Sequence, residues 1–178
     1  MRALGPGSVS SLLKIILDVV YVALWIGAGG AVALLGLAAL LLSFNPDLLS
    51  HITLTAGGQE VVGHRAPFLF VGLLSVGLYI GGVLVIVDRL RRIFTTLTAG
   101  DPFHPDNVTR LRVVGLMLAM LELGRYAMWT AGAWLFPAAN EVKPNFSLTA
   151  WFSVLVVFVL AEVFREGARL RREAELTI

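Results

Sequence analysis

The sequence predicts an all-α integral membrane protein, a bundle of four transmembrane helices with a small β-hairpin in its first outward loop. Apolar residues make up 57% of the 178 positions, above the roughly 45–50% that is typical of soluble domains. The mean hydropathy is +0.83. Four apolar runs also meet, or come near, the ~20 residues that a helix needs to cross ~30 Å of hydrocarbon. At this length we expect one membrane domain over residues 1–178.

The first predicted span covers residues 12–44 and is long enough to cross the bilayer with some tilt. Arg2 and Lys14 precede its apolar run, as in a signal peptide, but the run far exceeds the ~7–15 apolar residues of such a peptide. We therefore expect an uncleaved helix. In the second span, Gly77 and Gly81 form a GxxxG pair that would let helices approach closely. We favour packing within one bundle over a homodimer, which stays an alternative.

The first outward loop contains HITLTAGGQEVVG, two short β-prone runs around a Gly-Gly turn. Such a pattern predicts a small hairpin, although two isolated strands are marginal in stability. We favour a hairpin that caps the helices over one that shapes a ligand site, because no acidic or aromatic cluster accompanies the turn.

The remaining spans are predicted at residues 67–87, 113–136 and 148–163, which pairs the helices into two helical hairpins. Residues 88–112 then form a connector, and residues 164–178 form a helical tail that continues the fourth span out of the membrane.

Lys and Arg gather on one side of the predicted membrane domain. Two, Arg2 and Lys14, lie in the N-terminal segment and the first turn of the first span, five in the connector and four in the tail, against two on the opposite side and one deep within a span, which accounts for all 14. Cytoplasmic loops carry an excess of Lys and Arg. We therefore expect both termini, the connector and the tail to be cytoplasmic.

Two ionisable residues, Glu122 and Arg125, lie inside the third predicted span. Counting from Val113, Glu122 lies ~13 Å deep at ~1.5 Å per residue, where an unpaired charge costs ~2.5–3.5 kcal/mol on insertion scales. At i and i+3 the two side chains can meet on one helix face, with Tyr126 as a hydrogen-bonding neighbour. The pair is either a functional polar centre or an internally neutralised pair that orients the helices.

Asp18 and Glu162 lie nearer to the cytoplasmic ends of the first and fourth spans. Both can reach headgroups or water, so ordinary boundary charge is the favoured interpretation. The alternative is that they line one inward-facing cavity together with Glu122 and Arg125.

The connector contains AGDPFHPDNVTRLR, whose polar residues suggest either a chemical site or a turn. Gly100 suits a helix C-cap, Asp101 and Pro102 a turn, and Pro105 the first turn of a new helix, with His104 at the cap position. The Asp106 carboxylate would interact favourably with the positive end of that helix dipole. Phe103 can pack back as an anchor.

A metal site at Asp101, His104 and Asp106 is disfavoured, because the other histidines, His51 and His64, lie on the opposite side of the membrane. The sequence also lacks an HExxH or acidic calcium-loop motif. There is no cysteine to supply a thiolate. No hydrolytic motif occurs, so we expect neither an enzyme nor a bound cofactor or metal.

Apolar residues are interleaved with charges along the tail. Its end leaves Leu176 and Ile178 at a terminus, where they can dock on the connector or on a partner. We favour docking on the protein's own connector, and the alternative is a solvated basic extension near anionic headgroups. The predicted tail contact residues are Phe164, Arg165, Arg169, Leu176 and Ile178.

Two motifs, GDPFxxxNVxRLRxxG over residues 100–115 and LAEVFREGARLRREAELTI at the end of the chain, give a family resemblance. The chain resembles small four-span bacterial inner-membrane proteins that are classed only as a domain of unknown function. His104 stands where that family usually has Thr or Ser. The connector residues singled out by the motif and the turn are Gly100, Asp101, Pro102, Phe103, Asn107, Arg110 and Arg112.

The resemblance implies no particular chemical activity, but it does imply a gene neighbour. Such proteins are commonly encoded beside a small helix-turn-helix regulator. Our leading hypothesis is a non-enzymatic sensor or regulatory protein in the bacterial inner membrane that holds or releases this regulator through its connector and tail. We expect contact with the lipid bilayer and no direct contact with nucleic acid. The alternatives are a small transporter or exporter subunit that uses Glu122 and Arg125, and a scaffold subunit of a larger membrane complex.

Overall fold

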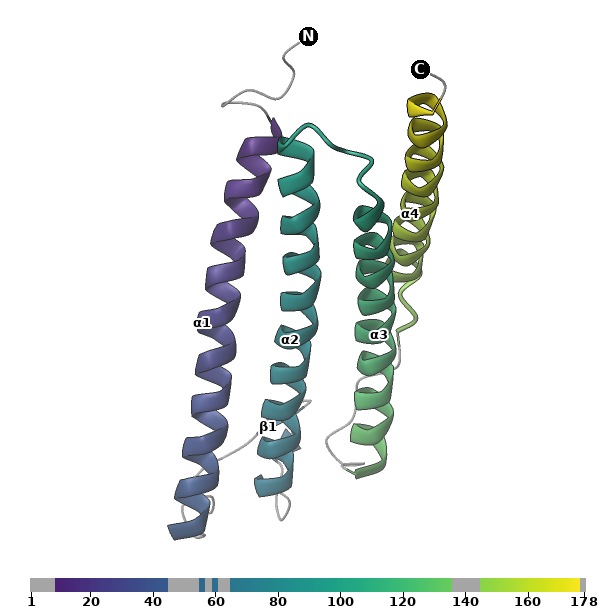
Figure 1. The fold of residues 1–178 in the computed structure, drawn as a ribbon. Helices are drawn as coiled ribbons and strands as arrows, with labels where there is room; N and C mark the ends of the chain where they lie inside the picture. Colours follow the sequence, from purple (N-terminus) through teal and green to yellow (C-terminus); the bar gives the residue numbers. More distant parts are fainter. Residues whose placement is uncertain (1–8, 45–54, 57–58, 61–64, 136–144, 177–178) are drawn as a thin grey trace. The chain divides into compact units, whose positions relative to one another are not determined.

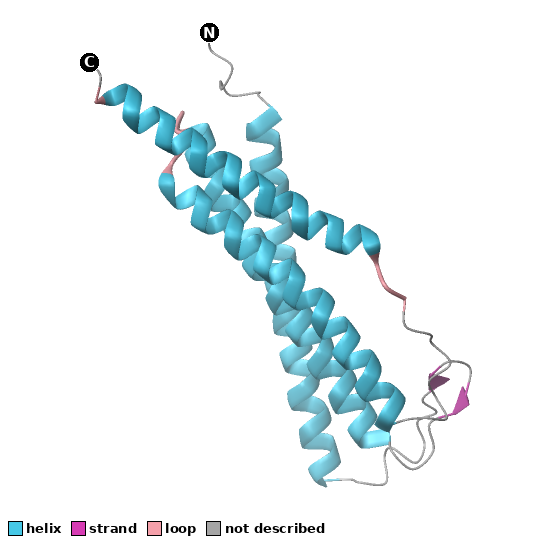
Figure 2. Ribbon diagram, turned by 90° about the vertical axis from the view of Figure 1, so that its right-hand side faces the viewer, coloured by secondary structure: helices cyan, strands magenta, loops and turns pink. Residues whose placement is uncertain are grey.

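The computed structural model describes residues 9–44, 55–56, 59–60, 65–135 and 145–176, and the described part is built on four long helices (Figure 1). The all-helical fold class is therefore confirmed. The helices are α1 (Val9–Phe44), α2 (Arg65–Thr98), α3 (Pro105–Leu135) and α4 (Leu148–Glu175). Figure 2 shows them in cyan, with two very short strands in magenta.

The strands are β1 (Thr55–Ala56) and β2 (Gln59–Glu60), which pair antiparallel with Thr55 opposite Glu60. They lie on either side of the Gly-Gly turn of the predicted hairpin. The rest of that hairpin, residues 51–54, 57–58 and 61–63, falls outside the described residues.

Three of the described helices are long and apolar enough to cross a membrane, over Leu12–Leu41 in α1, Val71–Thr98 in α2 and Leu148–Ala174 in α4. The chain is thus a membrane protein. The prediction of a span within α3 does not meet the same measure, although the helix is 31 residues long. Glu122 and Arg125 interrupt the apolar run of α3, and a charge near a helix centre opposes insertion.

The chain divides into two compact units, although α1, α2 and α3 contribute residues to both. The first unit contains residues 1–25, 82–120 and 147–178, and the second contains residues 26–81 and 121–146. Both are described separately below.

The core of the first unit joins α2, α3 and α4 at one level. Ile93, Leu111 and Ala161 are buried together, with exposed fractions of 4%, 7% and 2%. Charged residues flank this cluster on every helix, with Arg91 and Arg92 on α2, Arg110 and Arg112 on α3, and Glu162 on α4. The cluster therefore lies among the charged residues of all three helices, close to where the apolar runs of α3 and α4 end and just past the charges that end the apolar run of α2. We call the part of the first unit beyond it, residues 94–110 and 162–176, the charged end.

Helix continues through most of the predicted connector, residues 88–112. Within it α2 runs to Thr98 and α3 begins at Pro105, which agrees with the predicted C-cap at Gly100 and helix start at Pro105. Only residues 99–104 are non-helical. The helix persists because Leu90, Ile93 and Leu97 recur at helical spacing and pack on the core of the first unit.

The glycines of the GxxxG pair do not mark a close approach between helices. A Cβ built on Gly77 or Gly81 would meet no atom within 4 Å among the described residues, so no contact described here depends on these two glycines. A close approach occurs instead at Gly115 of α3, where a Cβ would lie 3.1 Å from the ring of Phe158 on α4. Helices α3 and α4 therefore pack side by side in the first unit (Figure 1).

Candidate functional site

The turn between α2 and α3 is built by local rules that the sequence predicted. Gly100 has φ of 85°, a left-handed conformation that glycine adopts without a steric penalty. The Gly100 amide donates to the Leu97 carbonyl at 3.1 Å and the Asp101 amide to the Thr96 carbonyl at 3.0 Å. This pair of bonds is a Schellman motif, which satisfies the last carbonyls of α2. The prediction of a C-cap at Gly100 is confirmed.

His104 caps the start of α3. Its Nδ1 accepts a hydrogen bond from the Asp106 amide at 3.2 Å, and its carbonyl accepts from the Asn107 amide at 2.9 Å. The cap is thus made by an imidazole nitrogen, although Ser, Thr, Asp or Asn is the usual capping residue. Pro105 is the first helical residue, as predicted, since its missing N–H would have no partner there.

Asn107 holds the whole turn together from within and is completely buried. Its Nδ2 donates to Thr96 Oγ1 at 2.7 Å and to the Pro102 carbonyl at 3.1 Å. Its Oδ1 accepts from Arg110 Nη1 at 2.9 Å, and the same Nη1 lies 3.1 Å from the Arg92 carbonyl. One amide side chain therefore joins the end of α2, the turn and the start of α3. The sequence placed Asn107 and Arg110 in the connector but did not predict this network.

Phe103 anchors the turn on the tail helix. Its ring lies 5.8 Å from that of Phe164, centroid to centroid. It also fills the space over Gly167, where a Cβ would lie 2.5 Å from two ring carbons. Gly167 is thus needed for its lack of a side chain, which lets the ring rest on the backbone of α4. The predicted anchor at Phe103 and the predicted contact at Phe164 meet each other.

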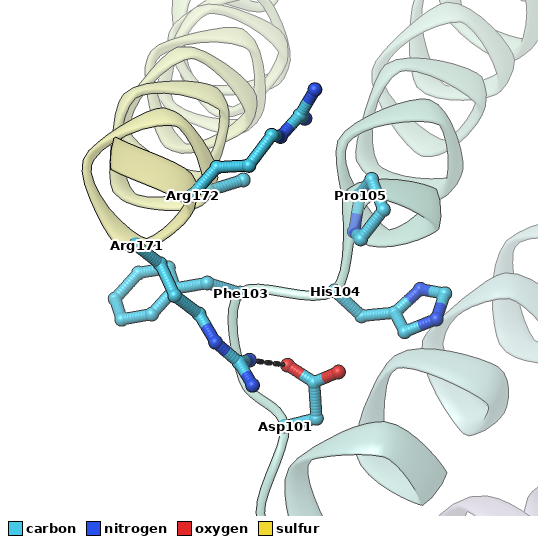
Figure 3. A pocket seen from close by; sticks show the side chains of 7 residues that line it. Asp101, Phe103, His104, Pro105, Arg171 and Arg172 are labelled. Carbon is cyan, nitrogen blue, oxygen red and sulfur yellow. Dashed lines mark hydrogen bonds and ion pairs between the residues drawn. The ribbon is translucent and has the colours of Figure 1, made fainter. Parts of the chain in front are cut away.

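An ion pair and an open recess complete the contact between turn and tail. Arg171 Nη1 donates to Asp101 Oδ1, and the two side chains are 48% and 35% exposed. A recess of about 500 Å³ opens beside this pair. Figure 3 shows Arg171 reaching Asp101, Arg172 extending towards the side on which Pro105 begins α3, and the His104 ring pointing away from α4. The recess is lined by Asp101, Phe103, His104, Pro105, Ala168, Arg171 and Arg172.

The tail contacts the connector, but not through the end that the sequence suggested. Leu176 is 84% exposed, so the prediction that it docks on the connector is wrong, and Ile178 lies outside the described residues. The contacts lie earlier in α4, at Phe164, Gly167, Ala168 and Arg171, which recur at helical spacing and so share one face.

Arg165 and Arg169, which were also predicted as tail contact residues, form their described ion pairs within α4. Arg165 pairs with Glu162, and Arg169 pairs with Glu166 at 2.6 Å and Glu173 at 3.4 Å. Such exposed pairs on one helix contribute little to stability.

The acidic residues of the turn each form a local ion pair. Asp101 pairs with Arg171, and Asp106 lies 3.6 Å from Arg110. Among the described residues no group of three His, Cys, Asp or Glu side chains is arranged to hold a metal ion. Arg112 is exposed and has no ion pair in the described part of the chain.

The second unit contains the ion pair predicted within α3. Arg125 Nη2 donates to Glu122 Oε1 at 2.6 Å and its Nε to Oε2 at 3.1 Å, a bidentate geometry. Glu122 is 8% exposed. Arg125 also donates to the Asn145 carbonyl at 2.9 Å and lies 4.8 Å from the centroid of the Tyr126 ring, which stacks on Phe146. The pair thus ties α3 to the segment that precedes α4.

Asp18 and Glu162 each form an ion pair with a different arginine. Asp18 Oδ1 accepts from Arg91 Nε at 2.5 Å, and the Arg91 guanidinium lies 4.2 Å from the centroid of the Tyr21 ring. Glu162 pairs with Arg165. Both carboxylates are therefore paired within the first unit. The Arg91 partner was not predicted, because nothing in the sequence gives the register between α1 and α2.

Replacing Glu122 with glutamine should lower the thermal midpoint of the detergent-solubilised protein. The neutral amide cannot make the charge-assisted bidentate contact, so Arg125 is left without its carboxylate. Glu162→Gln is the matched control, because Glu162 is 55% exposed and also pairs at i and i+3. An equal, small shift for both variants would contradict a structural role for the Glu122 pair.

The comparison with known proteins agrees with the resemblance in the sequence. The family described as "Protein of unknown function (DUF2975)" matches residues 52–178, well over half of the chain. The match covers both motifs, and it begins within the loop that holds β1 and β2. No curated protein and no solved structure matches the chain.

Proposed function

Because the chain belongs to the DUF2975 family, whose function is unknown, we propose that it is a non-enzymatic regulatory membrane protein that holds a small helix-turn-helix regulator at its charged end. The proposed setting is the bacterial inner membrane. In this proposal α3 is a fourth span, and the excess of Lys and Arg places the charged end and both termini in the cytoplasm.

The length of the helices supports a cytoplasmic binding surface. From Glu162, at the level where the helices become charged, α4 continues ~13 Å to Arg171 at ~1.5 Å per residue. The headgroup layer on each side of a bilayer is only roughly 5–8 Å thick. In this proposal the turn and the end of α4 lie at or beyond the headgroups, where a soluble protein can reach them.

The single observation that carries the proposal is the fixed contact between the turn and the tail. Phe103 rests on Gly167 and Phe164, Asp101 pairs with Arg171, and the network of Asn107 holds the turn. Two segments far apart in the sequence thus form one shaped and exposed surface. A surface that is held in place before binding loses less conformational freedom when a partner docks.

A truncation that stops after Ala168 tests the proposal. It removes Arg171 and Arg172 but keeps Phe164 and Gly167, so the Phe103 anchor remains. We expect the regulator encoded beside the gene to co-purify with the full chain in detergent and to be lost with this truncation, and expression of its target genes to change. The control stops after Glu175 and should behave as the full chain. If the full chain does not retain the regulator, the proposal is wrong.

The transporter alternative gains no support from the pair in α3. Glu122 is engaged through both carboxylate oxygens, and Arg125 is shared between Glu122, the Asn145 carbonyl and the Tyr126 ring. A charge that is neutralised within one helix and its adjoining segment leaves no free ligand for a substrate.

A further inference from the structure

We infer that the recess between the turn and α4 binds an acidic side chain of a cytoplasmic protein, with Arg172 as its main contact. This inference rests on the proposed function and names the chemistry that the partner must present.

The pattern of ion pairs along the tail singles out Arg172. Arg165, Arg169 and Arg171 each have a carboxylate partner within the described structure. Arg172, in the last turn of α4, has no carboxylate partner among the residues that the structure describes. Arg172 lines the recess, and its guanidinium points away from the pair of Arg171 and Asp101 (Figure 3). Among the described side chains, which do not include that of Glu175, the charge of Arg172 at the recess is therefore not balanced by a carboxylate.

The neighbouring pair shows which group this surface accepts. Arg171 already holds a carboxylate, that of Asp101, at the edge of the recess. Arginine presents a planar fork of donors that matches a carboxylate. A second carboxylate that enters the recess on the side of Arg172 would pair with it, and the charges of both arginines would then be balanced. A basic partner residue would instead meet two guanidinium groups.

The walls of the recess favour a protein rather than a lipid or a small ion. The side chains of Phe103, Pro105 and Ala168 give it apolar walls next to the arginines. Phe103 is 38% exposed, so an apolar neighbour of the acidic residue can rest on its ring. The recess is also open, so a protruding side chain can enter it from outside.

The test uses the full chain in nanodiscs of zwitterionic phosphatidylcholine and a labelled, glutamate-rich peptide that carries a single leucine. We expect the peptide to bind, with an affinity that falls as salt is added. Arg172→Glu should weaken binding roughly ten-fold or more. The matched control is Arg169→Glu, since Arg169 lies on the same helix but pairs with Glu166 and Glu173 outside the recess. Both variants are compared by thermal midpoint to show that they fold.

Binding that is absent, or that Arg172→Glu and Arg169→Glu weaken equally, overturns the inference. Co-purification of the neighbouring regulator separates the two proposals. If the regulator is retained equally by Arg172→Glu, the inference is wrong and the proposed function stands. If the peptide requires Arg172 and the regulator is not retained by the full chain, the inference stands and the regulator is not the partner.

Discussion

Replacing Asn107 with alanine should lower the free energy of unfolding of the charged end by about 2–4 kcal/mol. Asn107 is fully buried and bonds to Thr96, Pro102 and Arg110. Alanine leaves the Thr96 hydroxyl and the Pro102 carbonyl without this donor, and an unsatisfied buried polar group retains its desolvation cost. The thermal midpoint in detergent and amide hydrogen exchange over residues 99–104 measure the effect, and exchange should become faster.

Thr109→Ala is the matched control for Asn107→Ala. Thr109 lies on the same helix and is exposed, so the change should stay within about 0.5 kcal/mol. Equal hydrogen exchange in the turn for the two variants would contradict the role assigned to Asn107.

Replacing Gly167 with alanine should detach the turn from the tail. The new Cβ would lie 2.5 Å from Cδ1 and Cε1 of Phe103, which is closer than non-bonded carbon atoms approach each other. The Phe103 ring can swing out into solvent, so the backbone of α4 need not move. The ring would lose its contact with Phe164, and we expect a net destabilisation of about 1–2 kcal/mol after the better helix propensity of alanine is included.

Gly124→Ala is the control for Gly167→Ala, and we expect it to change stability in the opposite direction. A Cβ at Gly124 would meet no described atom within 4 Å, so alanine should stabilise α3 by up to about 1 kcal/mol through helix propensity alone. Thermal midpoints of opposite sign are therefore expected for the two substitutions. Limited proteolysis should cut the turn faster only in Gly167→Ala. If both variants become more stable, Phe103 does not anchor the turn.

The local part of the site could be predicted from the sequence, because its rules involve near neighbours. A left-handed C-cap favours glycine, and the first helical position tolerates proline, which fixes Gly100 and Pro105 without knowledge of the fold. The ion pair of Glu122 and Arg125 was predictable for the same reason, since residues at i and i+3 lie on one helix face. Apolar runs likewise predicted the four helices.

The contacts between helices could not be predicted, because they depend on register. Predicting the ion pair of Arg91 with Asp18, or the packing of the Phe103 ring on Gly167, would require the relative rotation of two helices to be known. One signal for the second contact was present. Gly167 is a lone glycine in a charged helix, where glycine costs about 1 kcal/mol relative to alanine and usually has a packing reason.

The error at Leu176 has a simple physical origin. Docking was assigned to an apolar side chain because of its composition, although helix geometry decides which residues share a face. The face of α4 that carries Phe164, Gly167, Ala168 and Arg171 meets the turn, and Leu176 lies past the last helical residue. The tail contacts the turn at Gly167, where the Phe103 ring packs, and at Arg171, which pairs with Asp101.

Photo-crosslinking in native membranes tests the regulator-binding proposal most directly. A photo-crosslinking amino acid in place of His104, whose ring points away from α4 at the rim of the recess (Figure 3), should give an adduct with the neighbouring helix-turn-helix regulator. The same amino acid in place of Leu123, which is 54% exposed on α3, should give none. An adduct with the regulator at position 104 alone is the expected result. Adducts with lipid alone at position 104, or with the regulator at both positions, would contradict a regulator held at the charged end.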